Sequence, residues 1–331
     1  MVRRTLMMGV WVGAWAAWQA GGCAGPLRCT YKTGDVQRVR YTVHDTYWSW
    51  VEMPDEPATA KDGQDLNRQV SFRQEVESVQ PDGSAVLRVT LDEVHVQVRK
   101  LLHEKETLLS YLSTAQKTES TSPGEPKLAG VTYRLRVAPD STVLEVLDLD
   151  QVRRQVGETA EQRGVMSLVL AEKALRQMHE HGFLQSAVSP GGKAVRNEPL
   201  PHFMIKAQAI RQEYTAGSVQ QSGAHKLVTV QGRGEPLHQL PKGWPSPPEP
   251  PDPGRTFLKN VSDMEQLSVT GTAAFDPAAG RVARDERKLS CRLVVLGEKV
   301  FKDRKLDQTK AKDEGILPTE VAVEETYELL P

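Results

Sequence analysis

The chain has 331 residues and a nearly even charge, with 42 lysines and arginines against 43 aspartates and glutamates. This balance argues against a nucleic-acid-binding protein, which would carry an excess of basic residues. The length is sufficient for one large domain or two ordinary domains with hydrophobic cores.

The amino terminus has the pattern of a bacterial export signal. Arg3 and Arg4 precede an apolar stretch that runs from Leu6 to Ala20. A basic start followed by a short apolar core is typical of a secretory signal. A helix of this length would cover about 22 Å, and a bilayer's hydrocarbon layer is roughly 30 Å thick. We therefore predict a signal peptide, with a permanent transmembrane helix as the alternative.

The segment Ala20-Gly21-Gly22-Cys23 resembles the lipobox of bacterial lipoproteins. That resemblance implies removal of residues 1–22 and lipidation of Cys23, whose palmitate-type acyl chains would anchor the mature chain to the bilayer. Ala24 stands where an Asp would retain a lipoprotein at the inner membrane, which implies an outer-membrane location facing the periplasm. The alternative is an ordinary cleavage site between small residues, with an incidental cysteine.

Two further cysteines, Cys29 and Cys291, would remain in the mature chain. In an oxidising compartment they are candidates for a disulfide between the start of the fold and a late strand. The alternative is two separate buried thiols. No spacing of cysteine and histidine indicates a zinc site, and we expect neither a metal nor a cofactor.

Strand patterns dominate the segment 23–150, which we predict to be an amino-terminal β lobe. Val39, Tyr41 and Val43 alternate with polar residues, as in a half-buried strand. "QPDGSAV" predicts a turn, and the apolar phase of the strand that follows slips at Asp92-Glu93, which indicates a β-bulge. Residues 113–127 predict a polar loop, and a second hairpin is expected over 131–147.

Trp48 and Trp50 form the aromatic cluster of this lobe. On an extended chain they share a face with the polar residues Arg40 and Thr42. Two indoles on a polar face are candidates for a ligand or partner surface. The alternative is that they cover the end of the sheet or pack under a loop.

Helical patterns are confined to the segment 151–186 and the two residues before it. A short helix is predicted over Leu149–Val156, and a longer one over Val165–His181. Gly182 is expected to end the longer helix in a left-handed conformation, with Phe183 folding back onto it. The sequence His179-Glu180-His181 is not expected to bind a metal, because residues two apart on a helix point to different faces.

The segment 187–331 predicts a second β lobe. Strands are expected over 225–232, over 268–275 with a break at Gly271, and over two later alternating runs. Residues 241–254 hold seven prolines, which predicts an extended surface spacer. Strands, then helices, then strands predict an α+β fold, mainly antiparallel, with a curved or half-barrel-like sheet.

Several of these segments resemble a family of uncharacterised bacterial envelope lipoproteins that carry a domain of unknown function. The matching segments are Gly34-Asp35, the hairpin "GVTYRLRVAPDSTVLEV", the helix "LAEKALRQM", "GTAAFDPAAGRV" and the ending "EETYELL". This resemblance implies an architecture similar to curved-sheet carriers of lipids and lipoproteins, with an apolar cavity between sheet and helices.

No catalytic pattern stands out in the sequence. We find neither a Gly-x-Ser-x-Gly motif nor a glycine-rich loop between a strand and a helix. We therefore expect a non-enzymatic, membrane-anchored lipoprotein that binds an apolar ligand or an envelope protein. One alternative is a structural or assembly lipoprotein without a small ligand, and another is a secreted hydrolase with carboxylates on loops.

Overall fold

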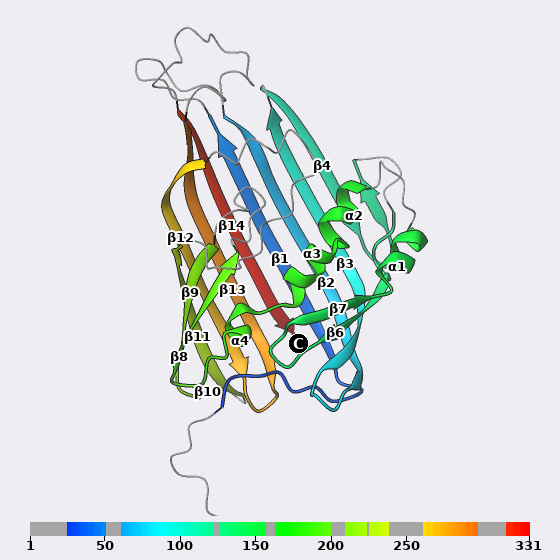
Figure 1. The fold of residues 1–331 in the computed structure, drawn as a ribbon. Helices are drawn as coiled ribbons and strands as arrows, with labels where there is room; N and C mark the ends of the chain where they lie inside the picture. The colour runs from blue at the N-terminus through cyan, green and yellow to red at the C-terminus, as the bar shows by residue number, and fades with distance from the viewer. Residues whose placement is uncertain are drawn as a thin grey trace, which may run out of the picture.

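The computed structural model describes residues 25–50, 61–102, 104–121, 126–156, 163–199, 209–223, 225–237, 261–296 and 316–331. Over these ranges the chain forms one mainly antiparallel sheet with a few short helices (Figure 1). The first strands are β1 (Val36–Ser49), β2 (Asp62–Val79), β3 (Ala85–Leu102), β4 (Lys105–Ser113), β5 (Thr118–Ser120), β6 (Thr132–Val137) and β7 (Val143–Leu147). The later strands are β8 (Lys193–Pro199), β9 (Ala209–Ala216), β10 (Gln220–Ser222), β11 (His225–Pro236), β12 (Val261–Asp276), β13 (Arg281–Leu296) and β14 (Ile316–Leu330).

The strands of the two predicted lobes lie in a single sheet. Its order is β5-β4-β3-β2-β1-β14-β13-β12-β11-β9-β8, with the hairpin β6–β7 added to β3 and with β10 paired to β11. The first and last strands pair with each other, so that Tyr41 lies opposite Tyr327. The predicted fold class, α+β with a curved and mainly antiparallel sheet, is therefore confirmed.

The helices cover one face of this sheet (Figure 1). They are α1 (Leu149–Val156), α2 (Arg163–Val169), α3 (Glu172–His179) and α4 (Gly182–Gln185). Alternate strand residues point toward them and form one continuous apolar core, which includes Val70, Phe72, Leu91 and Tyr133 together with Met178 and Phe183 from the helices. We call this covered side the inner face and the opposite side the outer face.

The first described residues tie three distant turns together at one end of the sheet. The amide of Leu27 donates to the carbonyl of Val188, that of Cys29 to Pro139, and that of Thr30 to Gly280, at 2.8, 2.7 and 2.8 Å. Val188 follows α4, Pro139 lies in the turn between β6 and β7, and Gly280 lies in the turn between β12 and β13. The amino-terminal segment is therefore fixed to this end of the fold.

Most of the local predictions for the first lobe are confirmed. Val39, Tyr41 and Val43 are buried on the inner face of β1, and Gly83 occupies the predicted turn with φ of +82°. The register of β2 against β3 shifts between Ser71 and Phe72, which leaves Asp92 unpaired at the predicted bulge. The second hairpin forms as β6 and β7, and α1 spans the predicted residues.

The prediction of one helix over Val165–His181 was wrong. The chain instead forms α2 and α3, separated at Ala171, whose backbone is extended with φ of −66° and ψ of 141°. Arginine side chains hold two carbonyls at this break, because Arg68 donates to Leu168 and Arg153 donates to Leu170. The two arginine side chains thus donate the hydrogen bonds that backbone amides would donate to these carbonyls if the helix continued.

The predicted role of Gly182 was also wrong. His181 is extended and Gly182 begins α4, so it does not end the preceding helix in a left-handed conformation. Glycine is required there by close approach, since a Cβ atom would lie 2.3 Å from the hydroxyl oxygen of Tyr214. Gly271 does not break its strand, because β12 continues through it.

Six strands were not predicted by the sequence pattern: β2, β4, β5, β8, β9 and β10. The segment expected to be a polar loop contains the end of β4 and the short strand β5. The proline-rich segment 241–254 and the charged stretch 298–314 lie outside the described residues.

Candidate functional site

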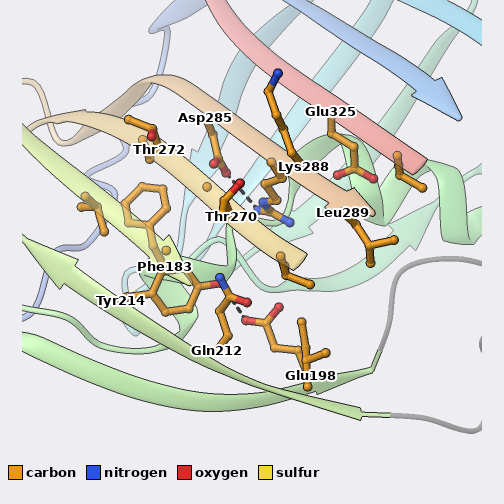
Figure 2. A pocket seen from close by; sticks show the side chains of 18 residues that line it. Phe183, Glu198, Gln212, Tyr214, Thr270, Thr272, Asp285, Lys288, Leu289 and Glu325 are labelled. Atoms are coloured by element: carbon orange, nitrogen blue, oxygen red, sulfur yellow. Dashed lines mark hydrogen bonds and ion pairs between the residues drawn. The ribbon is translucent and has the colours of Figure 1, made fainter. Parts of the chain in front are cut away.

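A cavity of about 80 Å³ lies on the inner face, where β9, β11, β12, β13 and β14 meet α4. Most of its wall is apolar, formed by Phe183, Ile210, Val230, Val269, Leu289 and Val323. Figure 2 shows Glu198, Gln212 and Tyr214 on one side of the cavity, and Asp285 and Glu325 on the other. We call this space the inner pocket.

The inner pocket exists because neighbouring strands present very small residues to it. Gly232 of β11 lies directly opposite Gly271 of β12, and Ala273 follows on the same face of β12. At these positions the inner face of the sheet has almost no side-chain volume. A Cβ atom at Gly232 would lie 2.8 Å from Nε2 of Gln212 and 3.2 Å from the Tyr214 ring, so glycine there lets these two side chains of β9 pack close to β11.

A buried ionic cluster forms one wall of the pocket. The Nδ1 atom of His181 lies 2.8 Å from Oδ2 of Asp285, and both side chains are buried. The Nη2 atom of Arg287 donates to the same carboxylate and to the backbone carbonyl of Glu180, each at 2.9 Å. Strand β13 is thereby joined to the segment between α3 and α4. The edge of the His181 ring meets Tyr327, with ring centroids 4.7 Å apart.

The pKa values of the two carboxyl groups of this cluster shift in opposite directions. Burial raises the pKa of Asp285, but Arg287 and His181 outweigh it and lower the pKa to about 2. Burial raises the pKa of Glu325, and Arg287 and Gln177 only partly offset this effect. Asp285 is therefore ionised at neutral pH, whereas Glu325 holds a proton more readily than an ordinary glutamate.

Strands β8 and β9 contribute the opposite polar wall. The hydroxyl of Tyr214 donates to Oε1 of Glu198 at 2.8 Å, and Arg196 lies 3.7 Å from the same oxygen. Gln212 is 4% exposed, and its Oε1 atom has no hydrogen-bond partner among the residues that the structure describes. Buried polar atoms usually have a partner, so this acceptor is the exceptional atom of the pocket.

An open groove of about 500 Å³ borders the inner pocket. It shares Glu198, Arg287 and Glu325 with the pocket, and its outer rim consists of charged and polar residues from α3, α4 and β8. These rim residues are Glu172, Lys173, Arg176, Gln177, Gln185 and Arg196. The site is therefore amphipathic, with a polar entrance above a mainly apolar recess.

Both histidines of the sequence His179-Glu180-His181 are buried: His179 is the last residue of α3, and His181 lies just before α4. His179 hydrogen-bonds the Tyr133 hydroxyl at 3.2 Å, and burial, with His181 nearby, lowers its pKa to about 3. Within the described ranges, no group of three or more His, Cys, Asp or Glu residues is placed to hold a metal ion.

None of the predicted site residues that the structure describes lines the inner pocket. Cys23 is outside the described residues. Trp48 lies over Gly63 on the outer face, and Trp50, just beyond β1, is buried beneath the Lys61 ammonium, which is 4.3 Å from the ring centroid. A ligand or partner role for the two tryptophans stays a prediction.

Cys29 and Cys291 are free cysteines, and the disulfide that was one of two predicted alternatives is not formed. Cys29 lies at the end of the sheet that holds the β6–β7 and β12–β13 turns, and its backbone amide donates to the carbonyl of Pro139. Cys291 lies far along β13, opposite Val321. Burial raises the pKa of each thiol to about 12.

The sequence analysis missed the charged interior of the site. In β14 the inward positions are Val321, Val323, Glu325 and Tyr327, so Glu325 stands where the alternation requires an apolar residue. Asp285 and Arg287 likewise precede Leu289 on the inner face of β13. The sequence signal that could have revealed the site is a charged residue at a position where the alternation of the strand predicts a buried apolar side chain.

The fold defines this chain as a mainly antiparallel, curved-sheet protein with helices on one face. No protein-family model matches the chain, and no curated protein matches it. Among solved structures it is similar to lipovitellin, in a structure concerned with lipid–protein interactions, at 7% identity and a TM-score of 0.41. That match covers 91% of this chain but 25% of the lipovitellin chain.

A second solved structure, DynF from the dynemicin biosynthesis pathway of Micromonospora chersina, is 8% identical with a TM-score of 0.21. It covers 97% of this chain and 92% of DynF. Neither TM-score reaches a level from which function can be argued. As for membrane-spanning helices, no helix within the described ranges is both long and apolar enough to cross a bilayer.

Proposed function

We propose that this protein is a non-enzymatic lipoprotein of the bacterial envelope that binds an apolar or amphipathic ligand on the inner face of its sheet. The observation that carries the proposal is the inner pocket, whose wall is mainly apolar and which shares Glu198, Arg287 and Glu325 with an adjoining groove lined by charged residues. Ligand sites typically combine an apolar lining with a few polar groups that fix orientation. An amphiphile would place its chain against Ile210, Val269 and Leu289, and its polar end in the groove.

The anchor in this proposal is Cys23, acylated after removal of the signal peptide. The described chain begins at Gly25 and is fixed at once to the turn end of the sheet by Leu27, Cys29 and Thr30. Acyl chains on Cys23 would therefore hold that end next to the bilayer. An outer-membrane position facing the periplasm is part of the same proposal.

A structural or assembly lipoprotein is the second candidate, and one observation favours it. The enclosed volume of about 80 Å³ is smaller than the several hundred Å³ typical of small-molecule sites. A chain could enter only in part unless the pocket widens. In the second candidate the groove would receive a side chain of an envelope protein instead.

Two experiments test the proposal. Metabolic labelling with radioactive palmitate should label the wild-type protein and leave Cys23→Ser unlabelled; labelling of both would refute the anchor. Native mass spectrometry of purified Cys23→Ser protein should find a bound amphiphile. A protein that carries no ligand would favour the structural candidate.

A further inference from the structure

Several turns gather around the first described residues at one end of the sheet (Figure 1). The backbone amide of Cys29 donates to Pro139 in the β6–β7 turn, and that of Thr30 donates to Gly280 in the β12–β13 turn. The β2–β3 turn lies beside them, because a Cβ atom at Gly83 would lie 3.2 Å from the Pro139 ring. These three turns and residues 25–35 therefore lie together, and we call them the turn surface.

The proposed lipid anchor is close to the turn surface. Leu27 is buried, and its amide donates to the Val188 carbonyl at 2.8 Å, so the chain is fixed at this residue. Cys23 is four residues earlier, and four residues span at most about 14 Å even when fully extended. The opposite end of the sheet is farther away, because the 18 residues of β2 extend over about 60 Å. An acyl anchor at Cys23 therefore brings the turn surface to the bilayer and keeps the opposite end away from it.

The tip of the β12–β13 turn is suited to contact with lipid. Its residues Pro277, Ala278 and Ala279 are exposed and have no polar side-chain atoms. Pro277 has no amide hydrogen, and the amides of Ala278 and Ala279 both donate to Oδ1 of Asp276 at 3.0 Å. Hydrogen-bond donors are costly in an apolar environment only when they lack a partner, so the donors of this tip can leave water at little cost. Val79, which ends β2 next to the β2–β3 turn, is exposed as well.

The turn surface carries little net charge. Arg28, Lys32 and Asp35 are exposed on the amino-terminal segment, and Asp82 is exposed in the β2–β3 turn. Asp140, in the β6–β7 turn, is half-buried and accepts a hydrogen bond from a backbone amide at 3.0 Å. Contact with a membrane must therefore depend on the anchor and the apolar tip, so a zwitterionic bilayer is sufficient.

Resting on the proposed function, whose anchor is Cys23, we infer that the turn surface docks on a phospholipid bilayer with residues 277–279 in its interfacial layer. The acyl chains attach the protein, and the apolar tip fixes the orientation of the sheet. The opposite end, where β3 meets β4, then faces away from the membrane.

The test measures lipid contact at chosen positions of the lipidated chain in phosphatidylcholine vesicles. A bimane fluorophore is attached at Ala278→Cys, and nitroxide groups on the lipid acyl chains serve as the quencher. Cys29 and Cys291 should stay unlabelled, because burial raises the pKa of each thiol to about 12. Leu108→Cys is the matched control, since Leu108 is 59% exposed and pairs with Arg99 near the opposite end of the sheet.

Nitroxide lipid should quench the probe at Ala278 and leave the probe at Leu108 as bright as in unlabelled lipid. No quenching at Ala278, or equal quenching at both positions, would overturn the inference. These outcomes leave the proposed anchor standing if the chain takes up palmitate and remains on the vesicles. A chain that takes up no palmitate would overturn the anchor and, with it, this inference.

A charged variant tests whether the tip itself enters the bilayer. With the probe at Val79→Cys, the added change Ala278→Asp should reduce the quenching, because a carboxylate is costly to remove from water. Ser290→Asp, an exposed position on the outer face of β13, is the control and should leave the quenching unchanged. Equal quenching with and without Ala278→Asp would contradict a role for the tip.

Discussion

The buried cluster that joins α4 to the sheet should dominate the response of this protein to acid. Asp285 is the centre of the cluster, since it contacts both His181 and Arg287. Its pKa is about 2 in the folded protein, compared with 3.8 for an ordinary aspartate. Each unit of pKa difference corresponds to about 1.4 kcal/mol, so ionised Asp285 contributes about 2 kcal/mol.

Replacing Asp285 with Asn should therefore lower the free energy of unfolding at pH 7 by at least about 2 kcal/mol. The loss should approach about 3–5 kcal/mol if Arg287 stays buried without its partner. Because the folded-state pKa is depressed, the contribution is complete above pH 3.8 and is lost as the pH falls toward 2. The difference between wild type and variant should accordingly shrink over that interval.

The assay is urea unfolding of Cys23→Ser protein, followed by circular dichroism, at pH 7, 5 and 2.5. Glu286→Gln is the matched control, because it neighbours Asp285 on the opposite face and its ion pair with Arg284 is partly exposed. That change should cost less than about 0.5 kcal/mol. A loss for Asp285→Asn equal to that of the control, or one that stays constant from pH 7 to 2.5, would refute the reasoning.

Two further predictions concern close packing. Gly182→Ala should destabilise the fold by about 1–3 kcal/mol, because the new Cβ would meet the Tyr214 hydroxyl oxygen at 2.3 Å; Gly217→Ala, whose Cβ meets nothing closer than 3.5 Å, should change the urea midpoint little. Cys29 and Cys291 should resist iodoacetamide at pH 8 in the folded protein, because burial raises both pKa values to about 12. Rapid alkylation of either thiol without denaturant would contradict the raised pKa values.

The sequence predicted those elements in which the apolar residues alternate without interruption. β1, the β6–β7 hairpin, α1 and the bulge at Asp92 follow from local patterns alone. β2 escaped notice because Arg68 occupies an inward position and interrupts the apolar stripe. Its guanidinium is buried because it binds the Leu168 carbonyl, a partner contributed by a distant helix.

The inner pocket could not be predicted for a related reason. It depends on Gly232 lying opposite Gly271, a register that only the assembled sheet defines. Glu325 and Asp285 were visible as charges within apolar alternations, and Arg287 lies two residues from Asp285 on the same strand, but His181 becomes a neighbour of Asp285 only when the segment before α4 packs on the sheet. Local patterns determine strands, whereas the site results from pairing between distant segments.

Ligand content of the purified protein tests the central claim most directly. Ala273 points into the inner pocket, and Ala274 lies next to it on the opposite face of β12. Organic extracts of Cys23→Ser protein carrying either Ala273→Phe or Ala274→Phe should be compared by mass spectrometry with the Cys23→Ser parent. We predict that the parent and Ala274→Phe carry the same amphiphile and that Ala273→Phe has lost it. Equal ligand in all three proteins, or none in any, would contradict binding in the inner pocket.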